Sequence, residues 1–203
     1  MNIAFVADKG GVGKSTLSYH VAARLALQGN DVCLVDLDRR GASSNWIRAM
    51  DPPRLQAYQA DDVVGRMPEH AMCVWDTPAH PSAKLRDSLA AGCDLLIVVA
   101  LTDRESHIAA AELCQRLLDE GANAAILVNS VRPTASAGRQ AVEAFTAAGL
   151  PCFETVIRSY ACYQHAQWDL RGVCDYPYSS ADNAWSDICA ATAEALAKGA
   201  SHA

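Results

Sequence analysis

The fold of this sequence is decided by the stretch Asp8-Lys9-Gly10-Gly11-Val12-Gly13-Lys14-Ser15-Thr16. It follows the apolar run 3–7, which is typical of a short buried strand, and it opens the segment 14–28, whose apolar residues recur at helical spacing. Glycines let a backbone wrap closely around an anion with its N–H groups pointing inward, and the positive end of the helix dipole adds to that attraction. The stretch therefore predicts a phosphate-binding loop between a strand and a helix.

Two common glycine patterns fail in this stretch. The pattern G-x-x-x-x-G-K-[ST] would need a glycine at Asp8, and the dinucleotide-binding pattern G-x-G-x-x-G would need one at Thr16. What remains is K-G-G-x-G-K-S-T. Within it we expect Lys14 to reach the β- and γ-phosphates of a nucleotide and the Ser15 hydroxyl to ligate Mg²⁺.

Apolar runs alternate with helical patterns along the rest of the chain. The expected strands are 3–7, 32–35, 55–58, 72–75, 95–101, 125–128 and 152–157, and the expected helices are 14–28, 108–118, 138–148, 160–171 and 181–198. This order predicts the α/β class: a single P-loop NTPase domain with a mostly parallel central sheet and helices on both faces. The chain of 203 residues suits one domain over 1–198, followed by a frayed tail at 199–203.

Composition excludes several classes of protein. No apolar run approaches the roughly 18–20 residues that span a bilayer, and the first residues do not resemble a signal peptide, so we expect a cytoplasmic protein with no membrane partner. The eight cysteines are scattered without a C-x-x-C pair, which favours reduced thiols over a disulfide or metal framework. The net charge of −6 argues against a dedicated nucleic-acid binder but leaves room for a local basic patch.

The K-G-G-x-G-K-S-T stretch resembles the deviant Walker A motif of the ParA/MinD family of P-loop ATPases, in which an extra lysine precedes the two glycines. The resemblance implies that Lys9 is the signature lysine, which reaches across a dimer to the partner's nucleotide. It makes Lys9 and Lys14 catalytic residues and implies ATP and Mg²⁺ as ligands. The implied nucleotide-binding residues of the loop are Gly10, Gly11, Val12, Gly13, Lys14, Ser15 and Thr16.

Acidic residues end two of the expected strands. Asp36 and Asp38 alternate at the end of the second strand and so share one face, at the edge where parallel sheets hold ligands. They resemble the family's D-x-D motif, which implies that Asp38 positions or activates the attacking water and that Asp36 supports the Mg²⁺ region. Asp76, in Asp76-Thr77-Pro78, resembles the Walker B residue, which holds Mg²⁺ through water or through Ser15.

The sequence departs from the family directly after the D-x-D motif. The usual Pro-Gln-Gly is Arg39-Arg40-Gly41 here. Two arginines near the γ-phosphate are compatible with charge neutralisation, with binding of a partner or nucleic acid, or with a solvated turn. The departure bears on hydrolysis and its stimulation rather than on nucleotide binding.

Two positions in the second half are candidates for contact with the base. Asn129 ends the strand at 125–128, and family members often carry asparagine there, close to the adenine. Pro177 falls in a segment that also lines the base in the family. Both assignments rest on the resemblance.

The resemblance implies a slow, partner-stimulated ATPase that dimerises on ATP and positions DNA or a large cargo. A ParB-like or cargo-adaptor activator and non-specific DNA on the nucleoid are the implied partners, with candidate DNA contacts at Arg132, Arg139, Arg158 and Arg171. A MinD-like membrane-cycling ATPase is an alternative, although 190–203 lacks a basic amphipathic pattern. A metal-cluster carrier would need a thiolate pair, and a metabolic ATPase would not need Lys9.

Overall fold

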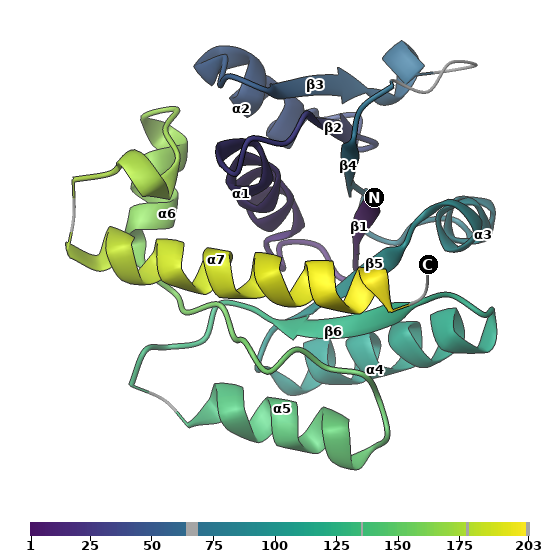
Figure 1. The fold of residues 1–203 in the computed structure, drawn as a ribbon. Helices are drawn as coiled ribbons and strands as arrows, with labels where there is room; N and C mark the ends of the chain where they lie inside the picture. The colour runs from purple at the N-terminus through teal and green to yellow at the C-terminus, as the bar shows by residue number, and fades with distance from the viewer. Residues whose placement is uncertain (64–68, 135, 178, 202–203) are drawn as a thin grey trace.

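The structure, a computed structural model, describes residues 1–63, 69–134, 136–177 and 179–201. Within these ranges six parallel strands form one sheet in the order β3-β2-β4-β1-β5-β6 (Figure 1). The strands are β1 Asn2–Val6, β2 Val32–Asp36, β3 Leu55–Gln59, β4 Met72–Asp76, β5 Leu95–Ala100 and β6 Ala124–Val128. The helices are α1 Lys14–Leu27, α2 Ala42–Met50, α3 Ala83–Gly92, α4 Arg104–Asp119, α5 Ala137–Ala147, α6 Ala161–Trp168 and α7 Ser179–Ala200, with short 3₁₀ turns η1 Ala60–Val63 and η2 Val173–Asp175.

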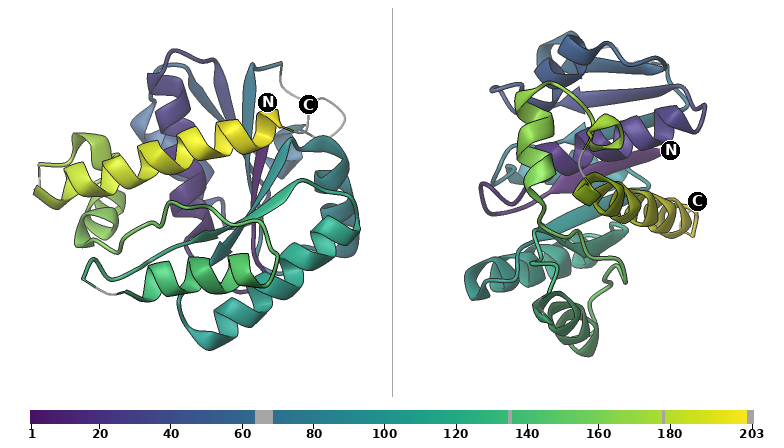
Figure 2. Two further views of the ribbon diagram at one scale, coloured as in Figure 1. Left: turned by 60° about the horizontal axis from the view of Figure 1, so that its bottom comes forward. Right: turned by 90° about the vertical axis from the view of Figure 1, so that its left-hand side faces the viewer.

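Two hydrophobic cores lie on opposite faces of the sheet, because alternate strand residues point in opposite directions. Ile3 and Phe5 of β1 join the core that α1, α2 and α7 cover. Ala4 and Val6 join the core beneath α3, α4 and α5. Helix α7 packs along α1 on the same face of the sheet, as Figures 1 and 2 show. The predicted α/β fold with helices on both faces is therefore confirmed.

The sequence pattern did not reveal α2 and α3, because both helices begin with contacts that periodicity does not show. The first turn of α2 is held from β2: the Asp36 carboxylate accepts from the Ser43 hydroxyl and from the Ser44 N–H. Helix α3 begins at the N-cap Ser82, whose side chain accepts from the backbone of Leu85. Among the described helices none is both long enough and apolar enough to cross a membrane.

The strand expected at 152–157 is wrong. Only isolated bridges form there, at Cys152 beside β6 and at Arg158 beside Val131. The backbone N–H groups of Glu154 and Thr155 donate to the Glu194 carboxylate of α7, so they leave the ladder that a strand would need. The segment nevertheless runs beside β6.

The C-terminal helix is longer than expected. Gly199 and Ala200, placed by the sequence in a frayed tail, continue α7, and a β-carbon at Gly199 would collide with the Met1 side chain. Residues 202–203 lie outside the described part of the chain. In the other direction, α6 is shorter than expected, since it ends at Trp168 rather than Arg171.

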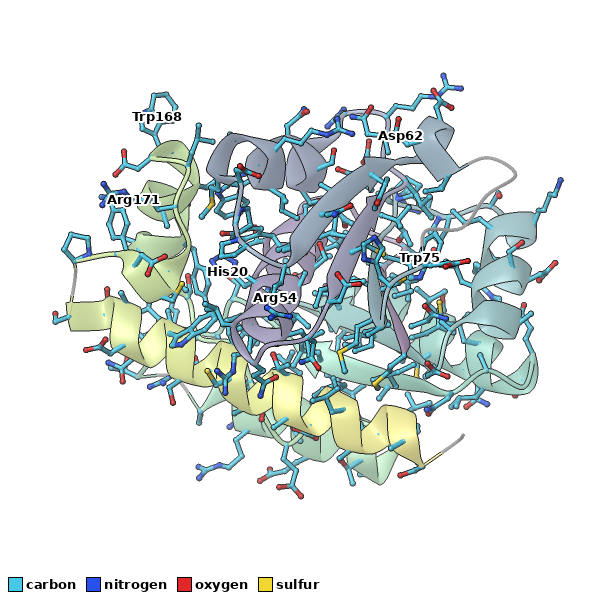
Figure 3. The ribbon with its side chains drawn as sticks, turned by 45° about the horizontal axis from the view of Figure 1, so that its top comes forward. His20, Arg54, Asp62, Trp75, Trp168 and Arg171 are labelled. Carbon is cyan, nitrogen blue, oxygen red and sulfur yellow. The ribbon has the colours of Figure 1, made fainter. Side chains whose placement is uncertain are left out.

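His20 of α1 is fully buried in an aromatic cluster (Figure 3). Its neighbours Tyr19 and Trp46 stack with ring centroids 4.1 Å apart, and its own ring meets Tyr163 of α6 edge-on at 5.4 Å. Nδ1 lies 2.7 Å from the Thr16 carbonyl, which only accepts, and Nε2 accepts from the backbone of Val173 at 3.3 Å. This neutral tautomer joins the phosphate-loop helix to the segment after α6.

Stability should fall with acid because of His20. Burial lowers the pKa of His20 to about 4, against the raising effect of its bond to the Thr16 carbonyl. His20 of the unfolded chain, with a pKa of about 6.5, binds a proton between about pH 6.5 and pH 4, whereas His20 of the folded chain stays neutral there. Stability is therefore lost as pH falls through that window. We expect His20→Gln to be less stable at pH 7.5, with the difference from the native chain shrinking by about 1.4 kcal/mol at pH 5.5 in urea unfolding.

The matched control is His80→Asn, at an exposed loop position with φ of 55° that asparagine tolerates. That variant should follow the native pH profile. Parallel pH profiles for the native chain and His20→Gln would contradict the assignment.

Candidate nucleotide-binding site

The predicted site residues lie at the carboxyl ends of the strands. Strands β1 and β4 are neighbours, and their connections run toward opposite edges of the sheet: β1 leads to β2 on one side, and β4 leads to β5 on the other. Parallel sheets bind ligands in the crevice outside such a switch point. The loops that follow β1, β2, β4, β5 and β6 all contribute to this edge.

The loop after β1 has the backbone that its glycines permit. Gly11 and Gly13 have φ values of 75° and 93°, in the left-handed region that favours glycine. A β-carbon at Gly13 would also collide with the side-chain amide of Asn129, which donates to the Val12 carbonyl at 2.6 Å. Asn129 therefore lies against the phosphate loop from the end of β6, and its contact with a base stays a prediction.

Lys14 begins α1 and is only 7% exposed. Burial lowers the pKa of Lys14, whereas the carboxylates of Asp76, Asp38 and Asp8 act in the opposite direction. The three carboxylates therefore compensate the charge of the Lys14 ammonium. A phosphate that entered the loop would be a further anion close to the same ammonium.

Asp36 and Asp76 are bridged by a residue that the sequence did not single out. The Ser43 hydroxyl lies 2.9 Å from Asp36 Oδ2 and 2.7 Å from Asp76 Oδ2, and both carboxylates are buried. A hydroxyl has a single proton to donate, so it cannot satisfy both carboxylates at once. Burial is the main reason why the pKa of Asp76 is raised to about 6; Asp36 also raises it, while Ser15, Ser43 and Lys14 lower it.

Asp36 also organises the D-x-D turn. Its Oδ1 accepts from the Asp38 N–H at 3.0 Å, and Asp38 Oδ1 accepts from the Arg40 N–H at 3.0 Å. Asp38 is half-buried and faces the phosphate loop. The two predicted aspartates thus differ: Asp36 holds the backbone of the turn, whereas Asp38 lines the cavity at the phosphate loop.

Two adjoining cavities share the phosphate loop. The first, about 370 Å³, is lined by Gly10, Gly11, Val12, Gly13, Lys14, Ser15, Thr16, Asp38, Arg40, Ala42, Thr77, Ala79 and Gln167. The second, about 320 Å³, is lined by Gly11, Val12, Gly13, Thr16, Leu17, Leu101, Asn129, Ser130, Ile157, Arg158, Ser159, Tyr160, Tyr163, Gln164 and Gln167. The first cavity has the charged residues Lys14, Asp38 and Arg40 in its wall, and the second has Tyr160 and Tyr163. This pair of cavities suits a phosphate chain continued by a base.

Lys9 is paired within its own chain. Its ammonium lies 2.8 Å from Asp103 Oδ1 and 4.0 Å from Glu105, and its side chain is 35% exposed. Asp103 is also the N-cap of α4, accepting from the Ser106 N–H. The partner that the sequence predicted for Lys9, a second copy's phosphate, would replace this ion pair.

Pro177 and the four candidate DNA contacts lie apart from this loop or are already paired. Pro177 lines a separate cavity with Asp169, Arg171 and Tyr176. Arg158 is held by the Asp187 carboxylate at 2.7 Å, and this bond raises its pKa. Arg171 projects outward beyond α6 (Figure 3), and Arg132 and Arg139 are exposed near α5. Arg158 thus forms part of the wall of the second cavity, and its charge is paired with Asp187.

Sequence reasoning missed Ser43, Asp103 and the α6 residues Gln164 and Gln167. A serine directly after the D-x-D turn, and an aspartate three residues before a serine at a helix start, were the available signals for the first two. Nothing in 160–167 marks those glutamines, because their role depends on where α6 packs.

No group of three or more His, Cys, Asp or Glu side chains suited to a metal occurs in the described ranges.

Residues 3–166 match the family described as the CobQ/CobB/MinD/ParA nucleotide binding domain. The chain belongs to this family. No curated protein matches it in sequence. The MinD/ParA fold is shown by solved structures such as MinD cell division protein from Aquifex aeolicus, with 17% identity, 97% of each chain covered and a TM-score of 0.75.

Two further structures of this fold were determined with nucleotides. MinD from Pyrococcus horikoshii, complexed with Mg-ADP, is 14% identical over 97% of this chain and 96% of its own, with a TM-score of 0.70. A plasmid partition protein from Borrelia burgdorferi, bound to AMPPNP, is 13% identical over 97% of this chain and 98% of its own, with a TM-score of 0.73. At these identities the likeness shows the shared fold.

Removing the bridging hydroxyl should destabilise the protein. Ser43→Ala removes the one hydroxyl proton that lies between Asp36 Oδ2 and Asp76 Oδ2, and Asp76 Oδ1 has no hydrogen-bond partner among the described residues. We expect a loss of about 1–3 kcal/mol at pH 7.5, measured by urea unfolding without nucleotide. Ser88→Ala on α3, which removes an exposed bond to the Lys84 carbonyl, should cost less than about 0.5 kcal/mol. Equal stability of the two variants would refute the bridge.

Proposed function

We propose that this chain is a ParA/MinD-type ATPase that binds ATP with Mg²⁺, dimerises on it and hydrolyses it slowly. The supporting observation is the convergence of the loop Gly10–Thr16, Lys14 and Asp38 on one cavity, with the buried Asp76 directly behind it. Family membership supports nucleotide binding, and the residues of the site support the γ-phosphate chemistry.

The residues at the end of β4 fit a bound Mg²⁺. Asp76 is fully buried, its Oδ1 has no hydrogen-bond partner in the part of the chain that the structure describes, and the nearby Ser15 hydroxyl helps to lower its pKa. Hard cations bind such oxygens. Ser15 is the proposed direct ligand, with Asp76 and Asp36 behind it. Mg²⁺ at this position supplies positive charge to the β- and γ-phosphates.

In the proposed reaction, the chain's own residues bind the nucleotide and direct the water. The loop N–H groups and Lys14 hold the β- and γ-phosphates, and Asp38 accepts a proton from the attacking water. The oxygen of that water bonds to the γ-phosphorus while the bond to the bridging oxygen breaks. ADP leaves with that electron pair, and the proton on Asp38 passes to solvent.

The proposed cellular role is ATP-dependent segregation or positioning of DNA or a large cargo, with an activator protein that accelerates hydrolysis. Lys9 of one copy would exchange Asp103 for the partner's phosphate, so that ATP favours the dimer and hydrolysis releases it. The exposed Arg132, Arg139 and Arg171 remain the proposed DNA contacts. Each chain carries a net charge of −6, and a dimer would present two copies of these arginines to one DNA molecule.

Lys14 and Asp38 should separate binding from hydrolysis. Lys14→Ala removes a buried cation, so we expect ATP affinity to fall at least about tenfold in calorimetric titration. Asp38→Asn keeps an acceptor for the Arg40 N–H, so affinity should stay within about threefold while hydrolysis falls by about 100-fold or more. Asp61→Asn, on the exposed turn η1, is the charge-matched control and should change neither. Native-like turnover in Asp38→Asn would remove the proposed water-activating role.

Lys9 should be required for assembly but not for binding of the nucleotide. With ATP, and not with ADP, we expect the native chain to form dimers in light scattering and to retain DNA on a filter. Lys9→Ala should lose both while keeping ATP affinity, whereas Lys84→Ala on the exposed face of α3 should behave as native. Unchanged dimerisation in Lys9→Ala would refute the trans role, and DNA retention without ATP would refute the proposed switch.

A further inference from the structure

The structure distinguishes the two arginines that depart from the family's pattern. Both follow Asp38, and the turn is fixed by two hydrogen bonds: the Arg40 N–H to Asp38 Oδ1 at 3.0 Å and the Gly41 N–H to the Asp38 carbonyl at 2.9 Å. Gly41 then takes a φ of 61°, which favours glycine, and α2 begins. This geometry places Arg40 in the wall of the phosphate cavity, among a lining set that does not include Arg39.

The Arg40 side chain has no protein partner in the part of the chain that the structure describes. Other arginines near the site are engaged: Arg158 with Asp187, and Arg116 with Asp8 at 3.5 Å. A guanidinium has five N–H donors in a rigid fork that matches two phosphate oxygens. Arg40 thus brings unpaired donors to a cavity that Lys14 already makes suitable for an anion.

We propose that Arg40 binds the γ-phosphate of ATP from within the same chain and stabilises the charge that develops on it during hydrolysis. The inference rests on the proposed ATPase function and adds a residue to it. The γ end is favoured because the turn joins Arg40 directly to Asp38, the residue proposed to orient the attacking water. Lys9, by contrast, lies against Asp103, so Arg40 supplies in cis a cation that is in place before any dimer forms.

A cis cation makes the chain discriminate ATP from ADP as a monomer. ADP lacks the phosphate that Arg40 binds, so removing Arg40 should weaken ATP binding selectively. Removing it should also lower kcat, because charge on the transferring phosphoryl group increases in the transition state. A positive charge alone should supply part of this stabilisation. Arg40→Lys should therefore keep part of the preference for ATP and part of kcat, although lysine lacks the planar fork.

The test compares Arg40→Gln, Arg40→Lys, Arg39→Gln and the native chain. Calorimetry measures affinity for ADP and for a non-hydrolysable ATP analogue, both with Mg²⁺, at concentrations where light scattering shows monomers. Steady-state assays give kcat and KM. For Arg40→Gln we expect preference for the analogue over ADP to fall at least about fivefold and kcat at least about tenfold, with ADP affinity unchanged. Arg40→Lys should lie between, and Arg39→Gln should match the native chain.

The outcomes separate this inference from the function on which it rests. Native nucleotide preference and turnover in Arg40→Gln would overturn the role of Arg40 and leave the ATPase intact. Equal losses in Arg39→Gln would overturn it as well, because they would indicate a general effect of surface charge. A native chain that binds neither nucleotide would overturn the proposed function, and the role of Arg40 with it.

Discussion

A buried cation held among carboxylates that are buried or half-buried is the constraint on which the rest of the structure depends. Lys14 has lost most of its water, and Asp76, Asp38 and Asp8 compensate its charge. Burial of ions is costly unless each has partners, so these groups must stay in register for the fold to be stable. The β1–α1 loop and the ends of β2 and β4 therefore meet at one point, because misplaced charges there would be left without partners.

The same constraint links the site to the far edge of the sheet. Asp36 ends β2, holds the D-x-D turn and receives the first turn of α2, while Ser43 returns from α2 to Asp76. A continuous chain of hydrogen bonds therefore joins the end of β4 to the first turn of α2. The segment 36–44 is at once part of the site and the start of that helix.

The sequence predicted those parts of the fold whose cause is local. Buried parallel strands such as 95–101 are continuous apolar runs, and the loop at 9–16 has glycines where the backbone requires them, so both could be recognised. Helix α2 could not, because Asp36 of another element holds its first turn. The false strand at 152–157 has strand-like residues, yet Glu194, some 40 positions later, takes its N–H groups. Pairings over such separations leave no local pattern.

The positions of Lys9 and Arg40 decide what a dimer would add. The ion pair of Lys9 with Asp103 is substantially exposed on both sides, and such pairs contribute at most about 1 kcal/mol. Exchanging Asp103 for a phosphate therefore costs little, while Asp103 keeps its role as the cap of α4 through the Ser106 N–H. Arg40 has no such exchange to make. Binding of ATP would thus begin within one chain. Lys9 would remain available to leave Asp103 and bind the phosphate held by a second copy.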